Sequence, residues 1–211
     1  MAWHWPVWLT LLALPALLLA EYRHSAIGKA LTKPVASLGF ILLAWTAGAS
    51  ESTYGLLILA GLVLSMAGDV LLLGRGRPAF LGGLIAFLVG HLLYVAAFLA
   101  RGVDWLAAAL AAIALAVVAS VLARLFLHKI ERTMRVPVIC YAVVISVMLA
   151  LAVGTVIDQM SLLILVGAIL FYLSDFSVAR DRLLVQAFIN RVWGLPAYFI
   201  GQLLLAASVS I

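Results

Sequence analysis

Two aspartates stand inside apolar segments of a chain that has few carboxylates. Asp69 lies in SMAGDVLLLG and Asp175 in FYLSDFSVAR, and the 211 residues include 8 Asp and Glu in total. A charged side chain at the centre of a membrane helix costs roughly 2.5–3.5 kcal/mol on insertion scales, so such a residue indicates a functional site. Two carboxylates in a poorly solvated place cannot easily both ionise, and one keeps its proton. We therefore predict that Asp69 and Asp175 form a catalytic acid–base pair.

Apolar runs long enough to cross a bilayer recur along the whole chain, which is 67% hydrophobic and 10% charged. These runs are too long for barrel strands, and a helix satisfies its own backbone in lipid. The sequence thus predicts an all-α, polytopic membrane protein with eight transmembrane helices in a single domain over residues 1–211. The first run lacks the positive start of a signal peptide and is expected to be retained. The expected spans are about 3–20, 34–49, 54–73, 79–100, 104–126, 135–155, 160–178 and 192–210.

The basic residues predict the orientation of these spans. Every Lys and Arg except Arg101 falls in or beside an odd-numbered connection. Because positive residues favour the cytoplasmic side, we expect those connections in the cytoplasm, both termini opposite it, and a bacterial inner (plasma) membrane as the location. The same scattered placement argues against a nucleic-acid partner, despite the net charge of +5.

Other polar residues are expected to join the aspartates in a cavity that opens to the cytoplasmic leaflet. Each aspartate should lie about 7–8 Å inside the boundary, with Ser65 beside Asp69 and Tyr172 beside Asp175 on the same helix face. Lys33 should begin the second span, and Asn190 and Arg191 should precede the eighth. The alternative is that several of these groups only join helices by hydrogen bonds. The candidate substrate-binding residues are Lys33, His91, Tyr94, Tyr172, Asn190, Arg191, Tyr198 and Gln202.

A weak internal similarity suggests two parallel four-helix repeats. Lys33-Pro34 in the first half matches Val136-Pro137 in the second, and the two aspartates follow at a similar offset. His91 with Tyr94, and Tyr198 with Gln202, then occupy the last span of each half.

Several other chemistries lack their residues. Only His91 lies within a span, too few for a zinc hydrolase or a bis-histidine haem site, and the lone Cys140 cannot form a cysteine cluster. Neither a G-x-S-x-G elbow nor a glycine-rich phosphate loop occurs. We expect no metal and no organic cofactor.

Six segments in order resemble the YhhN-like membrane family, which includes the lysoplasmalogenases. They are TKPVASLGF, LILAGLVLSMAGDVLLL, FLGGLIAFLVGHLLYVAAF, VICYAVVISVMLALA, GAILFYLSDFSVARDR and WGLPAYFIGQLLLA. The resemblance implies an eight-helix membrane enzyme that hydrolyses the vinyl ether bond of lysoplasmalogens, releasing a fatty aldehyde and glycerophosphocholine or glycerophosphoethanolamine. It also implies that the family's paired aspartates fall on Asp69 and Asp175 and its Lys-Pro on Lys33 and Pro34.

The chemistry expected of the residues agrees with this resemblance. A vinyl ether is cleaved through an oxocarbenium ion, which calls for one protonated acid and one ionised carboxylate, as in glycosidases. The partners would be a lysophospholipid substrate and membrane lipid, with Lys33 and Arg191 on the phosphate and Asn190 in a secondary contact. The competing hypotheses are a proton-coupled transporter or binder of a lipid-like small molecule, and a structural membrane subunit. The aspartates would titrate as a pair, so neither is assigned as the acid.

Overall fold

Eight long helices make up this computed structural model, which describes residues 4–74, 76–159 and 161–210. Each helix is long and apolar enough to cross a membrane, and the described residues contain no strand. The predicted all-α polytopic class is therefore confirmed. The helices are α1 (His4–Tyr22), α2 (Ala26–Thr46), α3 (Thr53–Leu71), α4 (Arg77–Arg101), α5 (Trp105–Phe126), α6 (Arg132–Gln159), α7 (Leu162–Leu183) and α8 (Phe188–Ala207).

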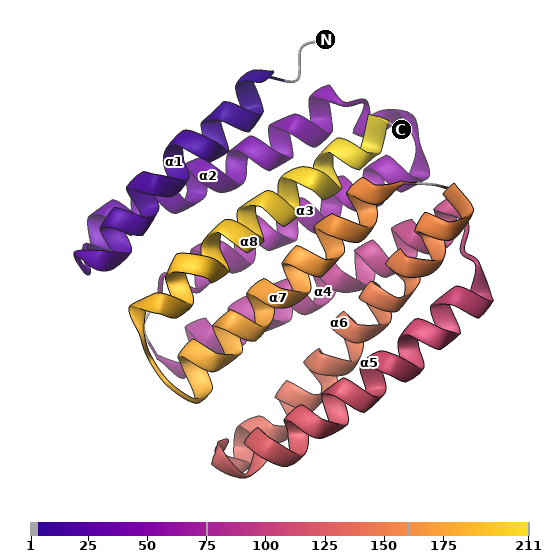
Figure 1. Cartoon of the computed structure of the whole chain (residues 1–211). Helices are drawn as coiled ribbons and strands as arrows, with labels where there is room; N and C mark the ends of the chain where they lie inside the picture. Colours follow the sequence, from indigo (N-terminus) through magenta and orange to yellow (C-terminus); the bar gives the residue numbers. More distant parts are fainter. Residues whose placement is uncertain (1–3, 75, 160, 211) are drawn as a thin grey trace.

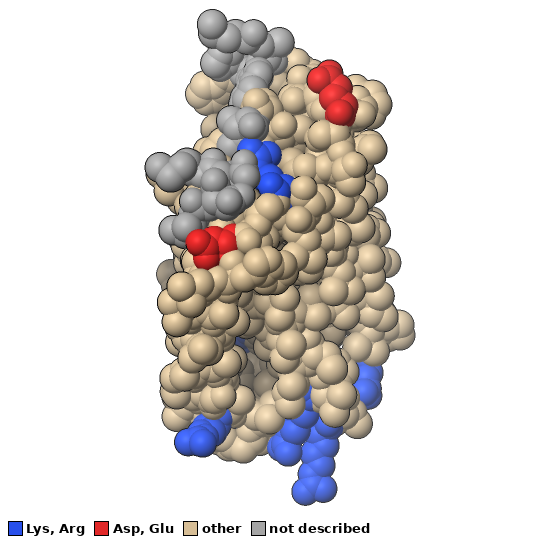
Figure 2. Space-filling model, turned by 90° about the vertical axis from the view of Figure 1, so that its right-hand side faces the viewer, with Lys and Arg blue, Asp and Glu red and all other residues tan. Residues whose placement is uncertain are grey.

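The helices run roughly along one direction and form a bundle (Figure 1). α1 and α2 lie at one edge, α5 and α6 at the other, and α3, α4, α7 and α8 between them. The start of α1 and the end of α8 lie at the same end of the bundle, as an even number of spans requires. Most of the Lys and Arg side chains visible in Figure 2 gather at the opposite end.

Two helices begin four or more residues earlier than the sequence suggested. α2 starts at Ala26, where the Ser25 hydroxyl accepts a 3.1 Å hydrogen bond from the Gly28 amide, so Lys33 and Pro34 lie inside the helix. A proline is tolerated within a membrane helix, and Pro34 was for that reason a poor boundary signal. α8 starts at Phe188, which places Asn190 and Arg191 in its first turn. Both changes move predicted site residues from connections onto helices.

The two halves of the chain use similar helix pairs. α1–α2, α2–α3 and α3–α4 pack together in the first half, and α5–α6, α6–α7 and α7–α8 in the second. Glycines allow close approach in both halves: a Cβ at Gly90 would lie 3.3 Å from the Gly61 carbonyl oxygen, and one at Gly201 would lie 2.9 Å from that of Gly167. The halves also join reciprocally, α2 against α8 and α6 against α4. The parallel repeat remains a prediction that these pairings favour.

The outer helices break this correspondence. α1 packs against α2 and also against α8, whereas α5 packs extensively against α6 alone among the described membrane helices. Ala108 is the buried residue of α5, and most of the helix is exposed. The second half is consequently more open than the first along its outer side.

Candidate active site

Asp69 is contacted by three donors from two other helices. Lys33 of α2 places its Nζ 3.1 Å from Oδ1, while the hydroxyls of Ser37 and Tyr198 donate to Oδ2 at 2.6 and 2.7 Å. Asp69 is 2% exposed, in the last turn of α3, and Lys33 is 9% exposed. Two buried opposite charges at this distance stabilise each other, and the hydroxyls satisfy the remaining lone pairs. Both carboxylate oxygens of Asp69 are therefore engaged by groups of α2 and α8.

Asp175 has a different neighbour. Its Oδ2 lies 3.1 Å from Nε2 of His91, which comes from α4 and is fully buried. The contact is close but poorly aligned, so neither atom has a well-formed hydrogen bond. The Tyr141 hydroxyl of α6 also faces this carboxylate. Asp175 thus lacks a permanently charged partner such as Lys33, which lies beside Asp69.

The hydrogen bond of the second ring nitrogen of His91, Nδ1, determines where hydrogens can lie in the His91–Asp175 pair. Nδ1 lies 2.7 Å from the Phe87 carbonyl oxygen, which only accepts, so Nδ1 bears a hydrogen. Nε2 then carries a hydrogen only in the imidazolium form. Close approach of Nε2 to Asp175 is favourable when one proton is shared, either as imidazolium and carboxylate or as imidazole and carboxylic acid. The geometry can therefore accommodate one proton between Nε2 and Oδ2.

An aromatic cluster links the two aspartate sites. Phe171 stacks on the His91 ring at a centroid distance of 4.3 Å and lies 5.6 Å from the Tyr198 ring. Phe87 lies 5.8 Å from the Tyr198 ring and 6.2 Å from that of Phe171. Tyr198 binds Asp69 at the other side of this cluster. The rings keep His91 and Tyr198 in place and provide an apolar wall beside both carboxylates.

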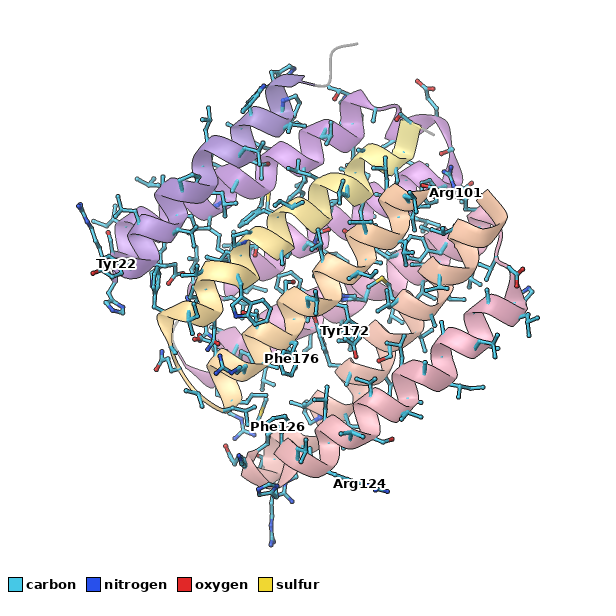
Figure 3. The ribbon with its side chains drawn as sticks, in the orientation of Figure 1. Tyr22, Arg101, Arg124, Phe126, Tyr172 and Phe176 are labelled. Atoms are coloured by element: carbon cyan, nitrogen blue, oxygen red, sulfur yellow. The ribbon has the colours of Figure 1, made fainter. Side chains whose placement is uncertain are left out.

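Asp69 and Asp175 line one cavity of about 520 Å³, a volume within the range of small-molecule sites. Its lining residues lie in the half of the bundle that contains the basic helix ends, and Figure 2 shows a hollow in that half. Tyr172 and Phe176 of α7 point toward the space between α7 and α5 (Figure 3). The cavity is thus open near one membrane face and has the two carboxylates in its wall.

A network of charged groups lies at the polar end of the cavity. Arg191 contacts Glu21 of α1 at 2.6 Å and Asp181 of α7 at 2.7 Å. The Asn190 side chain donates to the Val185 carbonyl at 2.8 Å and accepts from Arg180. Arg191 and Asn190 therefore bind other protein groups, and the same holds for Lys33 with Asp69.

Tyr94 and Gln202 lie deeper, behind the cavity wall. The Tyr94 hydroxyl donates to Oε1 of Gln202 at 2.8 Å, and both side chains are fully buried. Nε2 of Gln202 and Oγ of Ser65 have no hydrogen-bond partner among the described residues. The expected contact between Ser65 and Asp69 is wrong, because Asp69 extends toward α2 and α8.

The structure brings most of the predicted residues together but in unequal roles. Lys33, Tyr172, Asn190, Arg191 and Tyr198 line the cavity, while His91, Tyr94 and Gln202 support it from behind. Sequence reasoning missed Ser37 and Tyr141. Ser37 could have been found, because it stands four residues after Lys33 and so shares its helix face. Tyr141 lies on an apolar helix with no such signal. Among the described residues, no group of three or more His, Cys, Asp or Glu could hold a metal.

The comparisons with known proteins place the chain in a family. A model of the YhhN family matches residues 28–209. This chain belongs to the YhhN family. Neither the curated proteins nor the solved structures contain a match to it. The matched region of this YhhN protein begins within α2 and includes both aspartates, Lys33 and His91. Glu21, which holds Arg191, comes from α1 and lies before that region.

Proposed function

We propose that this YhhN protein is a membrane lysoplasmalogenase that hydrolyses the vinyl ether bond of a lysophospholipid. The observation that carries the proposal is the unequal pair in one cavity: a carboxylate paired with Lys33, and a carboxylate that lies 3.1 Å from Nε2 of His91. Vinyl ether hydrolysis needs one group that gives a proton to carbon and one negative charge that stabilises the resulting cation. The family membership supports a protein of this kind.

In the proposed reaction the Asp175–His91 pair is the acid. Its proton goes to the β-carbon of the vinyl ether, whose π electrons form the new C–H bond and leave an oxocarbenium ion. The Asp69 carboxylate stabilises that positive charge. Water adds to the cation and its surplus proton returns to Asp175–His91. The hemiacetal then breaks its C–O bond to the glycerol, and its hydroxyl proton passes to the leaving oxygen, which gives the aldehyde and the glycerophospho-alcohol. The pair thus ends with the proton it began with.

The polar end of the cavity is the proposed site of the lipid headgroup. Lys33 and Arg191 were expected there, but Lys33 binds Asp69, and the guanidinium group of Arg191 binds Glu21 and Asp181. Lys29 and Arg180 line the same end, and the nearest carboxylate to Lys29 is 3.6 Å away. We assign the phosphate to these two side chains, because the partner of Arg180 is the neutral amide of Asn190 and no ion pair of Arg180 occurs among the described residues. Arg191 then positions α1 and α7 around the headgroup.

Aldehyde release by the purified protein in detergent tests this function. Asp69→Asn and Asp175→Asn should each lower the rate at least about 100-fold, the usual scale of acid–base catalysis, while each protein still inserts and purifies. The saturated ether analogue should release no aldehyde. A wild-type protein that releases none from lysoplasmalogen, without gradient or partner, would instead favour the transporter hypothesis.

A further inference from the structure

The apolar end of the cavity is formed by α5, the helix that has the fewest neighbours. Ala119, Leu122, Ala123 and Phe126 line the cavity at a spacing that places them on one face of α5. Across from them lie Ile139, Ala142 and Ile145 of α6 and Phe176 of α7. Phe126 and Phe176 mark the two sides of this space in Figure 3. We call this region the apolar arm.

The two halves of the protein differ at this place. In the first half, the outer helix α1 packs against both α2 and α8. In the second half, α5 packs extensively against α6 alone among the described membrane helices, although it shares the cavity with α7. The apolar arm is thus bounded on its outer side by a helix that is otherwise mostly exposed.

The two ends of the cavity suit the two ends of an amphiphile. Glu21, Lys29 and Asp181 line the end formed by α1, α2 and α7, and the apolar arm lines the end formed by α5. Both carboxylates line the same cavity, and the helices that carry them, α3 and α7, lie between α1 and α2 at one edge of the bundle and α5 at the other (Figure 1). A ligand with its headgroup at the polar end and its reactive bond at the carboxylates must direct its chain toward α5.

We infer that the substrate's alkyl chain lies in the apolar arm and leaves the protein sideways, beside α5, into the bilayer core. This inference rests on the proposed function, since it takes a single-chain lysolipid as the ligand. Hydrocarbon beyond the arm stays in lipid, so added CH₂ groups exchange one apolar environment for another and contribute little to affinity. The protein then selects for the headgroup and the bond but not for chain length.

A matched pair of substitutions on α5 tests the position of the chain. Ala123 faces the arm, whereas Ala114 is exposed and lies on the opposite face of the same helix. The probe is a hexadecyl ether lysophosphocholine, which is saturated and cannot be hydrolysed, bound to the full chain in lipid nanodiscs. Ala123→Trp should weaken binding about tenfold, which is ~1.4 kcal/mol, and Ala114→Trp should leave it unchanged. Equal effects of the two substitutions, or none at Ala123, would overturn the inference.

A chain-length series tests the open exit without any substitution. Dodecyl, hexadecyl and octadecyl ether probes should bind the wild-type protein with equal affinity once their partitioning into the nanodisc is corrected. A fall at the longest chain would mean a closed arm and would overturn the sideways exit. The sideways exit is also wrong if Ala114→Trp abolishes a dimer while the Ala123→Trp variant binds the probe as the wild type does. The outer face of α5 would then be a contact with another protein chain.

The binding and aldehyde readouts separate this inference from the proposed function. Binding of the saturated probe in the arm without aldehyde release from lysoplasmalogen would refute the enzyme and leave the lipid site. Aldehyde release with no sensitivity to Ala123→Trp would support the enzyme and refute the arm.

Discussion

The two aspartate sites occupy corresponding places in the two halves of the chain but have unlike partners. Asp69 on α3 meets α2 and α8, and Asp175 on α7 meets α6 and α4, the same relation with the halves exchanged. The first site has an ammonium group and two hydroxyl donors. The second has an imidazole and a phenol. A similar arrangement of helices thus gives the two carboxylates unlike partners, as the proposed division into a stabilising charge and a proton donor requires.

Among the substitutions that distinguish the two aspartate sites, removal of Lys33 should have the largest effect. Lys33→Met leaves a buried, uncompensated carboxylate, a change that costs about 3–5 kcal/mol in buried ion pairs. We expect a large loss of thermal stability in detergent and loss of aldehyde release. Lys29→Met, at the polar end of the cavity, should leave stability nearly unchanged.

The double variant Lys33→Met/Asp69→Asn separates stability from catalysis. It removes both charges and should recover much of the thermal stability but none of the activity. Recovery of aldehyde release in this variant would show that the negative charge at Asp69 is not needed.

Replacement of His91 should remove the exchangeable proton and keep the fold. His91→Gln cannot titrate, so kcat should fall about 100-fold with little change in KM, and the dependence of kcat on pH should flatten. The exposed His128 offers the control His128→Gln. A wild-type pH profile in His91→Gln would assign the proton to another group.

Loss of the Tyr198 hydroxyl should have a smaller effect than the substitutions of Lys33 and His91. Tyr198→Phe removes one of three donors to Asp69, and a hydrogen bond to a charged group contributes about 1.5–3 kcal/mol. We expect roughly a tenfold fall in kcat/KM, which corresponds to the lower end of that range. Tyr94→Phe provides the matched control, because its hydroxyl binds Gln202 and neither carboxylate. An equal effect of both substitutions on activity would mean that Tyr198 acts only through packing.

The helices and the choice of the two aspartates could be predicted from the sequence better than the residues that contact those aspartates. Apolar length alone fixes the number of spans in lipid, and a carboxylate within such a span is rare enough to be informative. The partners depend on how helices cross. Ser65 shares a helix face with Asp69, yet the carboxylate reaches Ser37 and Tyr198 on other helices. Spacing within one helix does not determine those contacts.

The sequence also could not separate side chains that touch the cavity from those that support its wall. His91 and Gln202 are both polar residues within membrane helices, but His91 contacts a carboxylate and Gln202 contacts a tyrosine. The exposure of α5 could not be predicted from the sequence either, because an apolar helix covered by protein and one covered by lipid have similar compositions.

The contact between Glu21 and Arg191 has a consequence for truncated forms of the protein. A polypeptide starting at residue 28 would keep the whole family region but lose α1, and with it the carboxylate that neutralises Arg191 from one side. It would also have an odd number of crossings, so its amino terminus would emerge on the basic side. Glu21→Gln in the full-length chain isolates the electrostatic part of that loss from the change in topology.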